Sequence, residues 1–150
     1  MPSSSYWLTT LQRVREHRRD TALQALAQRL QAATQIREAA ANIESMISRL
    51  GQAQQQSGQV GRLDSERLRQ LRQERDELRT QFDELRNRQN SADAAVRLAH
   101  ANAIAKDADA KVLRRLQDRV DSAERQAQRR RDEQTPLDVA VSLCKGPLPD

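Results

Sequence analysis

The second half of the chain carries a seven-residue repeat of apolar side chains that strongly limits the folds it can adopt. From Leu68 to Ala127, steps of three and four residues alternate strictly, and thirteen of the eighteen positions on this register are apolar. These thirteen are Leu68, Leu71, Leu78, Phe82, Leu85, Ala92, Val96, Ala99, Ala103, Ala110, Leu113, Val120 and Ala127. A period near 3.5 residues implies left-handed supercoiling of one α-helix against another. The repeat therefore predicts a coiled coil.

Five positions of the same register are polar. They are Arg75, Gln89, Lys106, Gln117 and Glu124. Polar residues in a coiled-coil seam commonly fix the register of the pairing at some cost in stability. We interpret these five as residues that control register rather than as a functional site.

The first half of the chain carries a matching stripe. Its members, each three or four residues from the next, are Leu23, Leu26, Leu30, Ala33, Ile36, Ala40, Ile43, Ile47 and Leu50. Upstream, Leu8, Leu11 and Val14 begin the stripe, but Arg18 and Thr21 interrupt it. Such spacing keeps side chains on one helix face. It predicts a helix over about residues 6–56, with looser pairing at its start.

Two glycines within four residues, Gly58 and Gly61, mark a loop over residues 57–63. A loop this short makes the helices on either side antiparallel. Pro136 predicts the end of the second helix, since proline lacks an amide donor. The sequence therefore predicts an all-α fold, an antiparallel coiled-coil hairpin over 1–134 with its second helix at 64–134, followed by a flexible tail at 135–150.

The predicted second helix is longer than the first. Folding the chain about the centre of the loop places Arg13 near residue 105, which leaves the last 20–25 residues of the second helix without an opposing helix. Leu113, Leu116 and Val120 continue the apolar stripe into this overhang. Because soluble proteins usually cover such surfaces, we expect the overhang to dock against a partner or a second copy.

Nothing in the sequence predicts an enzyme, a cofactor or a metal site. The chain has no glycine-rich phosphate loop, no HExxH and no serine elbow, and its carboxylate pairs fall on open helix faces. Cys144 is the single cysteine, and His17 and His100 lie far apart in the sequence. No apolar run has the length of a signal peptide or a membrane span, so we expect a soluble intracellular protein.

The net charge is +5, and two clusters of arginine stand out. They are Arg13, Arg15, Arg18 and Arg19 near the start, and Arg125, Arg129, Arg130 and Arg131 near the end of the predicted second helix. Guanidinium groups bind carboxylates or phosphates. Neither cluster contains the aromatic residues that stack on single-stranded nucleic acid, and a hairpin is not a basic zipper. Protein carboxylates are favoured; a nucleic-acid-binding hairpin and a self-associating structural coiled coil remain alternatives.

Both ends of the chain resemble the FliJ and YscO family, the central-stalk proteins of flagellar and injectisome type III export. The segment LQRVREHRRDTALQALAQRLQ is similar to the family's opening pattern of leucine, valine, arginine, alanine and leucine. The segment RRRDEQTPLDVA is similar to its ending, in which an arginine-rich helix leads into Glu-Gln and Leu-Asp. The long helical hairpin between these segments agrees in layout.

The resemblance implies a non-enzymatic cytoplasmic protein, with or without peripheral association at the inner face of the cell membrane. It implies insertion of the paired termini into the hexameric export ATPase, and contact with the export gate and with export chaperones. The arginines at matching positions are Arg13, Arg15, Arg18, Arg19, Arg129, Arg130 and Arg131. Together with Leu113, Leu116 and Val120, they form the predicted partner-binding set.

Overall fold

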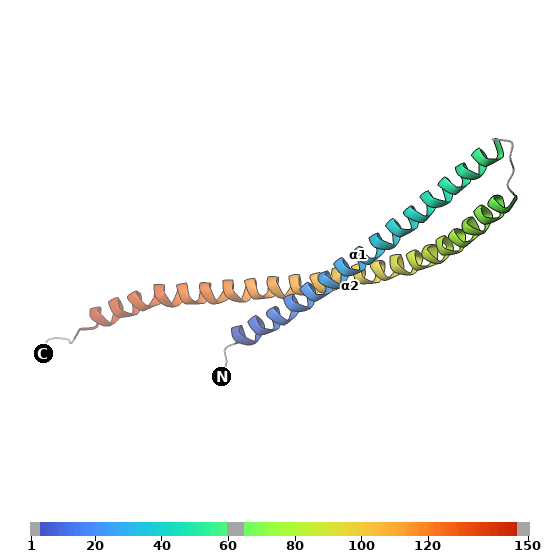
Figure 1. The fold of residues 1–150 in the computed structure, drawn as a ribbon. Coiled ribbons are helices and arrows are strands. Elements are labelled where there is room, and N and C mark those ends of the chain that lie inside the picture. The colour runs from blue at the N-terminus through green and yellow to red at the C-terminus, as the bar shows by residue number, and fades with distance from the viewer. Residues whose placement is uncertain (1–3, 60–64, 147–150) are drawn as a thin grey trace. The chain divides into compact units, whose positions relative to one another are not determined.

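The protein folds into two long α-helices, drawn as α1 and α2 in Figure 1. The computed structural model describes residues 4–59 and 65–146. Helix α1 spans Ser4–Gln59 with 56 residues, and α2 spans Ser65–Cys144 with 80 residues. The helices pack against each other, so the predicted all-α hairpin with a longer second helix is confirmed.

The start of the predicted loop is helical. Helix α1 continues through Ser57 and Gly58, and the Ser57 hydroxyl donates a hydrogen bond to the Ala53 carbonyl oxygen at 2.9 Å. Glycine permits a turn without requiring one, so it did not mark the end of the helix. Residues 60–63 of the predicted loop and the last four residues of the predicted tail, 147–150, lie outside the described residues.

The described residues fall into two compact units. One unit, here called the central unit, contains residues 20–59 and 65–104. The other, the terminal unit, contains residues 4–19 and 105–146. Each unit therefore combines a stretch of α1 with a stretch of α2.

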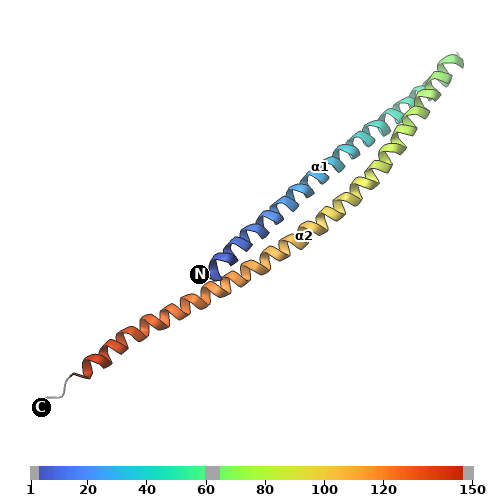
Figure 2. The same ribbon diagram turned by 90° about the horizontal axis from the view of Figure 1, so that it is seen from below.

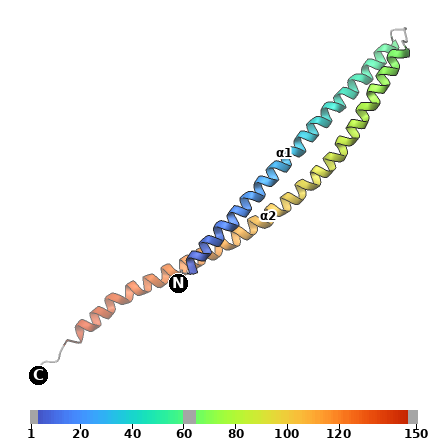
Figure 3. The same cartoon turned by 60° about the horizontal axis from the view of Figure 1, so that its bottom comes forward.

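In the central unit the two helices run side by side in opposite directions, as Figures 2 and 3 show. Arg37 of α1 forms an ion pair with Asp93 of α2 at 2.7 Å. Further along α1, Gln54 accepts a hydrogen bond from Arg75 of α2 at 3.4 Å. Because the partner's number falls as the position along α1 rises, the pairing is antiparallel.

In the terminal unit, two ion pairs join the start of α1 to α2. Arg15 Nη1 lies 2.9 Å from Asp109 Oδ2, and Arg114 Nη2 lies 3.2 Å from Glu16 Oε1. Every described residue of α2 after Asp121 is exposed. In this unit α2 is therefore covered by the opposing helix only as far as about Asp121.

The most deeply buried positions of the seam carry mainly small side chains. The apolar residues that are less than one-tenth exposed are Leu8, Ala22, Ala33, Ala40, Leu71, Ala103 and Ala110. Five of these seven are alanine, and small side chains allow two helix backbones to approach each other closely. No large side chain is fully buried among the described residues.

The predicted stripe of α2 agrees with the structure along most of its length. Each predicted position from Leu68 to Val120, polar ones included, is buried or half-buried, whereas Glu124 and Ala127 are exposed. In α1 the prediction was wrong at Val14, Leu23 and Leu30, which are 42%, 47% and 48% exposed. The seam uses Ala22 in place of Leu23, because a seven-residue repeat carried in register from Leu8 reaches position 22 and not 23.

The predicted alignment of the helices needs a correction. The prediction set Arg13 near residue 105, but the observed pair Glu16 and Arg114 places α2 several residues further along. Helix α1 ends at Gln59 and α2 begins at Ser65, so the turn is centred later in the chain than the middle of the predicted loop. When the centre of the turn moves by one residue along the chain, the residue of α2 that lies opposite a given residue of α1 moves by two.

The same shift changes the predicted overhang. Leu113 and Val120 are half-buried, so they belong to the paired seam and not to an uncovered surface. Leu116 is 43% exposed and lies off the seam. The uncovered part of α2 begins after Asp121.

The predicted end of the second helix at residue 134 is also wrong, because residues 135–144 of the predicted tail are helical. Helix α2 contains Pro136 and continues to Cys144. Proline removes one backbone donor, but the helical hydrogen bonds resume beyond it, and Lys145 N still donates to Val141 O at 3.2 Å. Within the described residues, neither helix has a stretch that is both long and apolar enough to cross a bilayer.

Gly51 offers a test of the α1 assignment, because it lies in the helix interior with nothing within 4 Å of the place a Cβ atom would take. Glycine inside a helix is less favourable than alanine by about 0.5–1 kcal/mol. We expect Gly51→Ala to raise the free energy of unfolding by that amount in a urea titration followed by circular dichroism. Gly58→Ala, near the end of α1, is the control and should have a smaller effect. Destabilisation by Gly51→Ala would contradict the helix.

Candidate functional site

All ten residues of the predicted partner-binding set lie in the terminal unit. The structure divides the first arginine cluster into two kinds. Arg13 and Arg18 are exposed, whereas Arg15 and Arg19 are half-buried beside α2. Arg15 donates to Asp109 at 2.9 Å, so part of its charge is used within the fold. Arg13 and Arg18 are therefore the members best placed to meet a partner.

One side of the terminal unit is a charged cluster. Glu16 Oε1 accepts hydrogen bonds from Arg114 Nη2 at 3.2 Å and from Gln12 Nε2 at 3.1 Å. Lys111 Nζ lies 2.7 Å from Asp107 Oδ2. These side chains surround a small recess whose lining is Glu16, Arg19, Asp107, Ala110, Lys111 and Arg114. The cluster joins the two helices by alternating charges.

The pKa of Asp107 is lowered from its ordinary value. The main cause is the hydrogen bond from Lys111; partial desolvation opposes it, and the charges of Lys111 and Arg19 add to the lowering. The carboxylate is therefore held in its charged form and serves as the counter-ion of two cations. This is the electrostatics of a structural cluster, since a general acid would need a raised pKa.

The second arginine cluster lies on the uncovered part of α2. Arg129, Arg130 and Arg131 are exposed. Fifteen residues separate Arg114, which pairs with α1, from Arg129, and at about 1.5 Å per residue this is roughly 22 Å along the helix. The structure therefore places the two arginine clusters at different positions along the axis of α2. They form two separate basic surfaces of the same unit.

The positive charge of the chain is concentrated in the terminal unit. Its described residues include fourteen arginines and lysines against nine aspartates and glutamates, whereas the described central unit has eleven against ten. A local excess of one sign raises the local concentration of oppositely charged partners. The terminal unit is therefore the part of the molecule suited to an acidic surface.

The sequence interpretation missed a set of exposed apolar residues in the terminal unit. These are Trp7 and Val112, which are 54% and 63% exposed and lie off the coiled-coil seam. Val14, which the sequence places in the apolar stripe, is 42% exposed and lies off the seam as well. The spacing of seven residues between Trp7 and Val14, which places both on one helix side, was the signal that could have found them.

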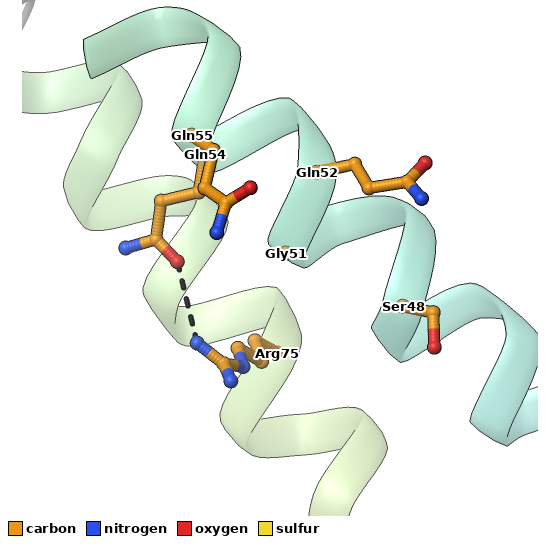
Figure 4. Close-up of a pocket in the computed structure, with 6 residues that line it drawn as sticks. All are labelled: Ser48, Gly51, Gln52, Gln54, Gln55 and Arg75. Atoms are coloured by element: carbon orange, nitrogen blue, oxygen red, sulfur yellow. Dashed lines mark hydrogen bonds between the residues drawn. The ribbon is translucent and has the colours of Figure 1, made fainter.

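The central unit has an open polar recess, shown in Figure 4. Its lining consists of Ser48, Gly51, Gln52, Gln54, Gln55 and Arg75. Arg75, half-buried at a seam position, donates to Gln54 of the opposing helix, while its Nε is buried with no hydrogen-bond partner. A cross-helix hydrogen bond at a partly unsatisfied polar seam residue is consistent with a role in fixing register.

Among the described residues there is no group of three or more side chains that could hold a metal ion, and Cys144 is an exposed free thiol. The structure thus defines a two-helix all-α protein with a charge-rich terminal unit. Comparisons with protein-family models, with curated proteins and with solved structures find no match to this chain.

Proposed function

We propose that this protein is a non-enzymatic stalk and adaptor of a flagellar or type III protein export apparatus. In this role the terminal unit enters the hexameric export ATPase, and the protein also contacts the export gate and export chaperones from the cytoplasmic side of the membrane. The observation that carries the proposal is the concentration of basic residues in the terminal unit, with Arg13, Arg18 and the cluster 129–131 exposed. The resemblance of both chain ends to the FliJ and YscO family agrees with it.

A stalk of this kind acts by binding several subunits of a ring at once. Exposed guanidinium groups offer forked donors to carboxylates on the inner surface of the ring. A ligand that binds the assembled hexamer but not its separated subunits shifts the equilibrium toward the hexamer. The expected result is a higher ATPase rate at protein concentrations where the ring is only partly assembled.

The test mixes the purified full chain with the export ATPase of the same organism and measures both binding and the rate of ATP hydrolysis. We expect stimulation, and we expect the double variant Arg13→Glu with Arg18→Glu to bind about tenfold or more weakly. Arg67→Glu with Arg69→Glu is the matched control, because both of these arginines are exposed and lie in the central unit. The control should bind and stimulate like the wild type.

Two outcomes would refute the stalk proposal. The first is the absence of both binding and stimulation by the unaltered chain. The second is an equal loss of affinity in the test and control variants, which would show a general effect of net charge and not a surface of the terminal unit.

Self-association is a second candidate, favoured by the uncovered end of α2. Its exposed apolar residues are Leu137, Val139, Val141 and Leu143. If this end joins two copies, sedimentation equilibrium will show a stable dimer that is lost when residues 136–150 are removed. A monomer at all concentrations would leave the stalk proposal as the only one of the two.

A further inference from the structure

One side of the terminal unit is apolar and uncovered. On α1 it carries Trp7 and Val14, and on α2 it carries Val112 and Leu116, which are between 42% and 63% exposed. Leu11 is half-buried between Trp7 and Val14 in the sequence. We call this surface, made of Trp7, Leu11, Val14, Val112 and Leu116, the apolar flank.

The ion pairs show that the two halves of this flank are neighbours. Trp7, Leu11 and Val14 are separated by steps of four and three, so they share one side of α1. Arg15 lies one turn after Leu11, at the edge of the seam next to that side, and its guanidinium contacts Asp109 at 2.9 Å. Asp109 precedes Val112 by three residues and Leu116 by seven, which places it on their side of α2. The Arg15–Asp109 pair therefore crosses from one stripe to the other.

The second ion pair lies on the opposite side. Arg114 follows Val112 by two residues and precedes Leu116 by two, which points it away from both on a helix with 3.6 residues per turn. Its partner Glu16 belongs to the charged cluster described above. The terminal unit therefore has two different sides, one charged and internally paired, the other apolar.

The rim of the apolar flank is basic. Arg18 follows Val14 by four residues, Arg119 follows Leu116 by three, and both are exposed. Asp109 is the acidic member of the two stripes, and it already forms an ion pair with Arg15. A ligand on this flank thus meets a half-exposed tryptophan, aliphatic side chains and two exposed arginines, and tryptophan and arginine are enriched among residues that dominate protein-binding energy.

We infer that the apolar flank is a docking site for an amphipathic α-helix of another protein, whose apolar stripe is bordered by glutamates or aspartates. Two adjacent helices with apolar residues three and four apart present ridges and grooves against which a third helix packs. The arginine rim selects carboxylates beside the stripe of that third helix. The inference does not require the export ATPase, because it rests on the flank alone.

Charge argues against the two other occupants. A second copy related by a two-fold axis would place the same flank against itself, so that Arg18 and Arg119 would meet arginines. A lipid surface would have to accommodate Asp109, which lies beside Val112 with its side chain 48% exposed. An acidic amphipathic helix satisfies the arginines and leaves the Arg15–Asp109 pair intact.

Trp7 gives a direct readout, because it is the single tryptophan of the chain. The probe is a synthetic helical peptide without aromatic residues, with leucines spaced by three and four and glutamates on either side of them. Titration of the full chain with this peptide at low ionic strength should shift the Trp7 emission to shorter wavelength as water is excluded. The same peptide with lysine in place of glutamate should produce no shift.

Two matched substitutions locate the site. Val112→Asp places a charge within the flank and should weaken peptide binding about tenfold or more. Ile104→Asp is the control, since Ile104 is 57% exposed and lies in the central unit. Because both side chains are exposed in the wild type, both variants should keep the wild-type circular dichroism and melting temperature.

Several results would overturn the inference. One is the absence of any Trp7 shift with the glutamate peptide, and another is equal binding by the two variants. A larger shift with vesicles of anionic phospholipid than with the peptide would make the flank a lipid site. A wild-type dimer in sedimentation equilibrium that Val112→Asp dissociates would make the occupant a second copy. Each of these is independent of the ATPase assay, so failure here does not decide the stalk proposal.

Discussion

Ala33→Asp is expected to lower the free energy of unfolding by about 2–4 kcal/mol more than the same substitution at the neighbouring position 32. Ala33 is 2% exposed, the most deeply buried of the seven seam residues. A carboxylate there would lose its hydration between two closely packed helices, and the described seam contains no buried polar or charged residue to compensate it. Urea denaturation followed by circular dichroism at 222 nm measures the difference.

Ala32→Asp is the matched control, since Ala32 is exposed on the adjacent position of the same helix. Both substitutions lose the same intrinsic helix propensity, about 0.7 kcal/mol, so this contribution cancels between them. Equal destabilisation of the two variants would mean that the alanine seam is not the interface that holds the helices together.

Pro136→Ala is expected to slow amide hydrogen exchange in the last turns of α2 by up to about a hundredfold. Proline in a helix interior is less favourable than alanine by about 3 kcal/mol, and the substitution restores an amide that can donate to the carbonyl of Asp132. Every residue from 122 to 146 is exposed, so no packing against another helix offsets the proline. Exchange measured by NMR on residues 137–144 reports the change directly.

Asp138→Ala is the control for this experiment. It also improves helix propensity in the same exposed segment, by about 0.7 kcal/mol, but it restores no missing hydrogen bond. Its effect on exchange should be at most about threefold. Similar protection in the two variants would show that the proline does not limit the stability of this part of α2.

The seam of α2 could be predicted from the sequence because its repeat is long. From Leu68 to Val120 the alternating steps of three and four identify the covered face even where Gln89 or Lys106 interrupts the apolar pattern. In α1 the signal was shorter and offered a choice between Ala22 and Leu23. Hydrophobicity favoured leucine, whereas the structure buries alanine, since the seven-residue register from Leu8 passes through position 22.

The alignment of the two helices could not be predicted with the same accuracy. It depends on where the turn is centred, and neither Gly58 nor a short loop fixes this to one residue. An error of a few residues moved Leu113 and Val120 from the seam to a supposed free surface. The predicted end of α2 differs from the observed one for another reason, because the backbone donor that Pro136 lacks is a single one and the helical hydrogen bonds resume beyond it.

The candidate site was predicted by residue type but not by environment. The sequence identified the arginines of the first cluster, yet only the structure distinguishes Arg15, which is engaged with Asp109, from Arg13 and Arg18, which are exposed. The apolar flank was missed because Trp7 and Val112 come from opposite ends of the chain. That both lie on one side of the terminal unit follows from the antiparallel pairing and cannot be read from either segment alone.

The small side chains at the most deeply buried seam positions also have a calorimetric consequence. The heat capacity change of unfolding grows with the apolar area that becomes exposed, and a methyl group contributes far less area than a leucine side chain. Because five of the seven most buried apolar residues are alanine and the larger seam side chains are only half-buried, this chain should unfold with a smaller heat capacity change than a globular domain of equal length. Its stability should therefore vary with temperature along an unusually flat curve.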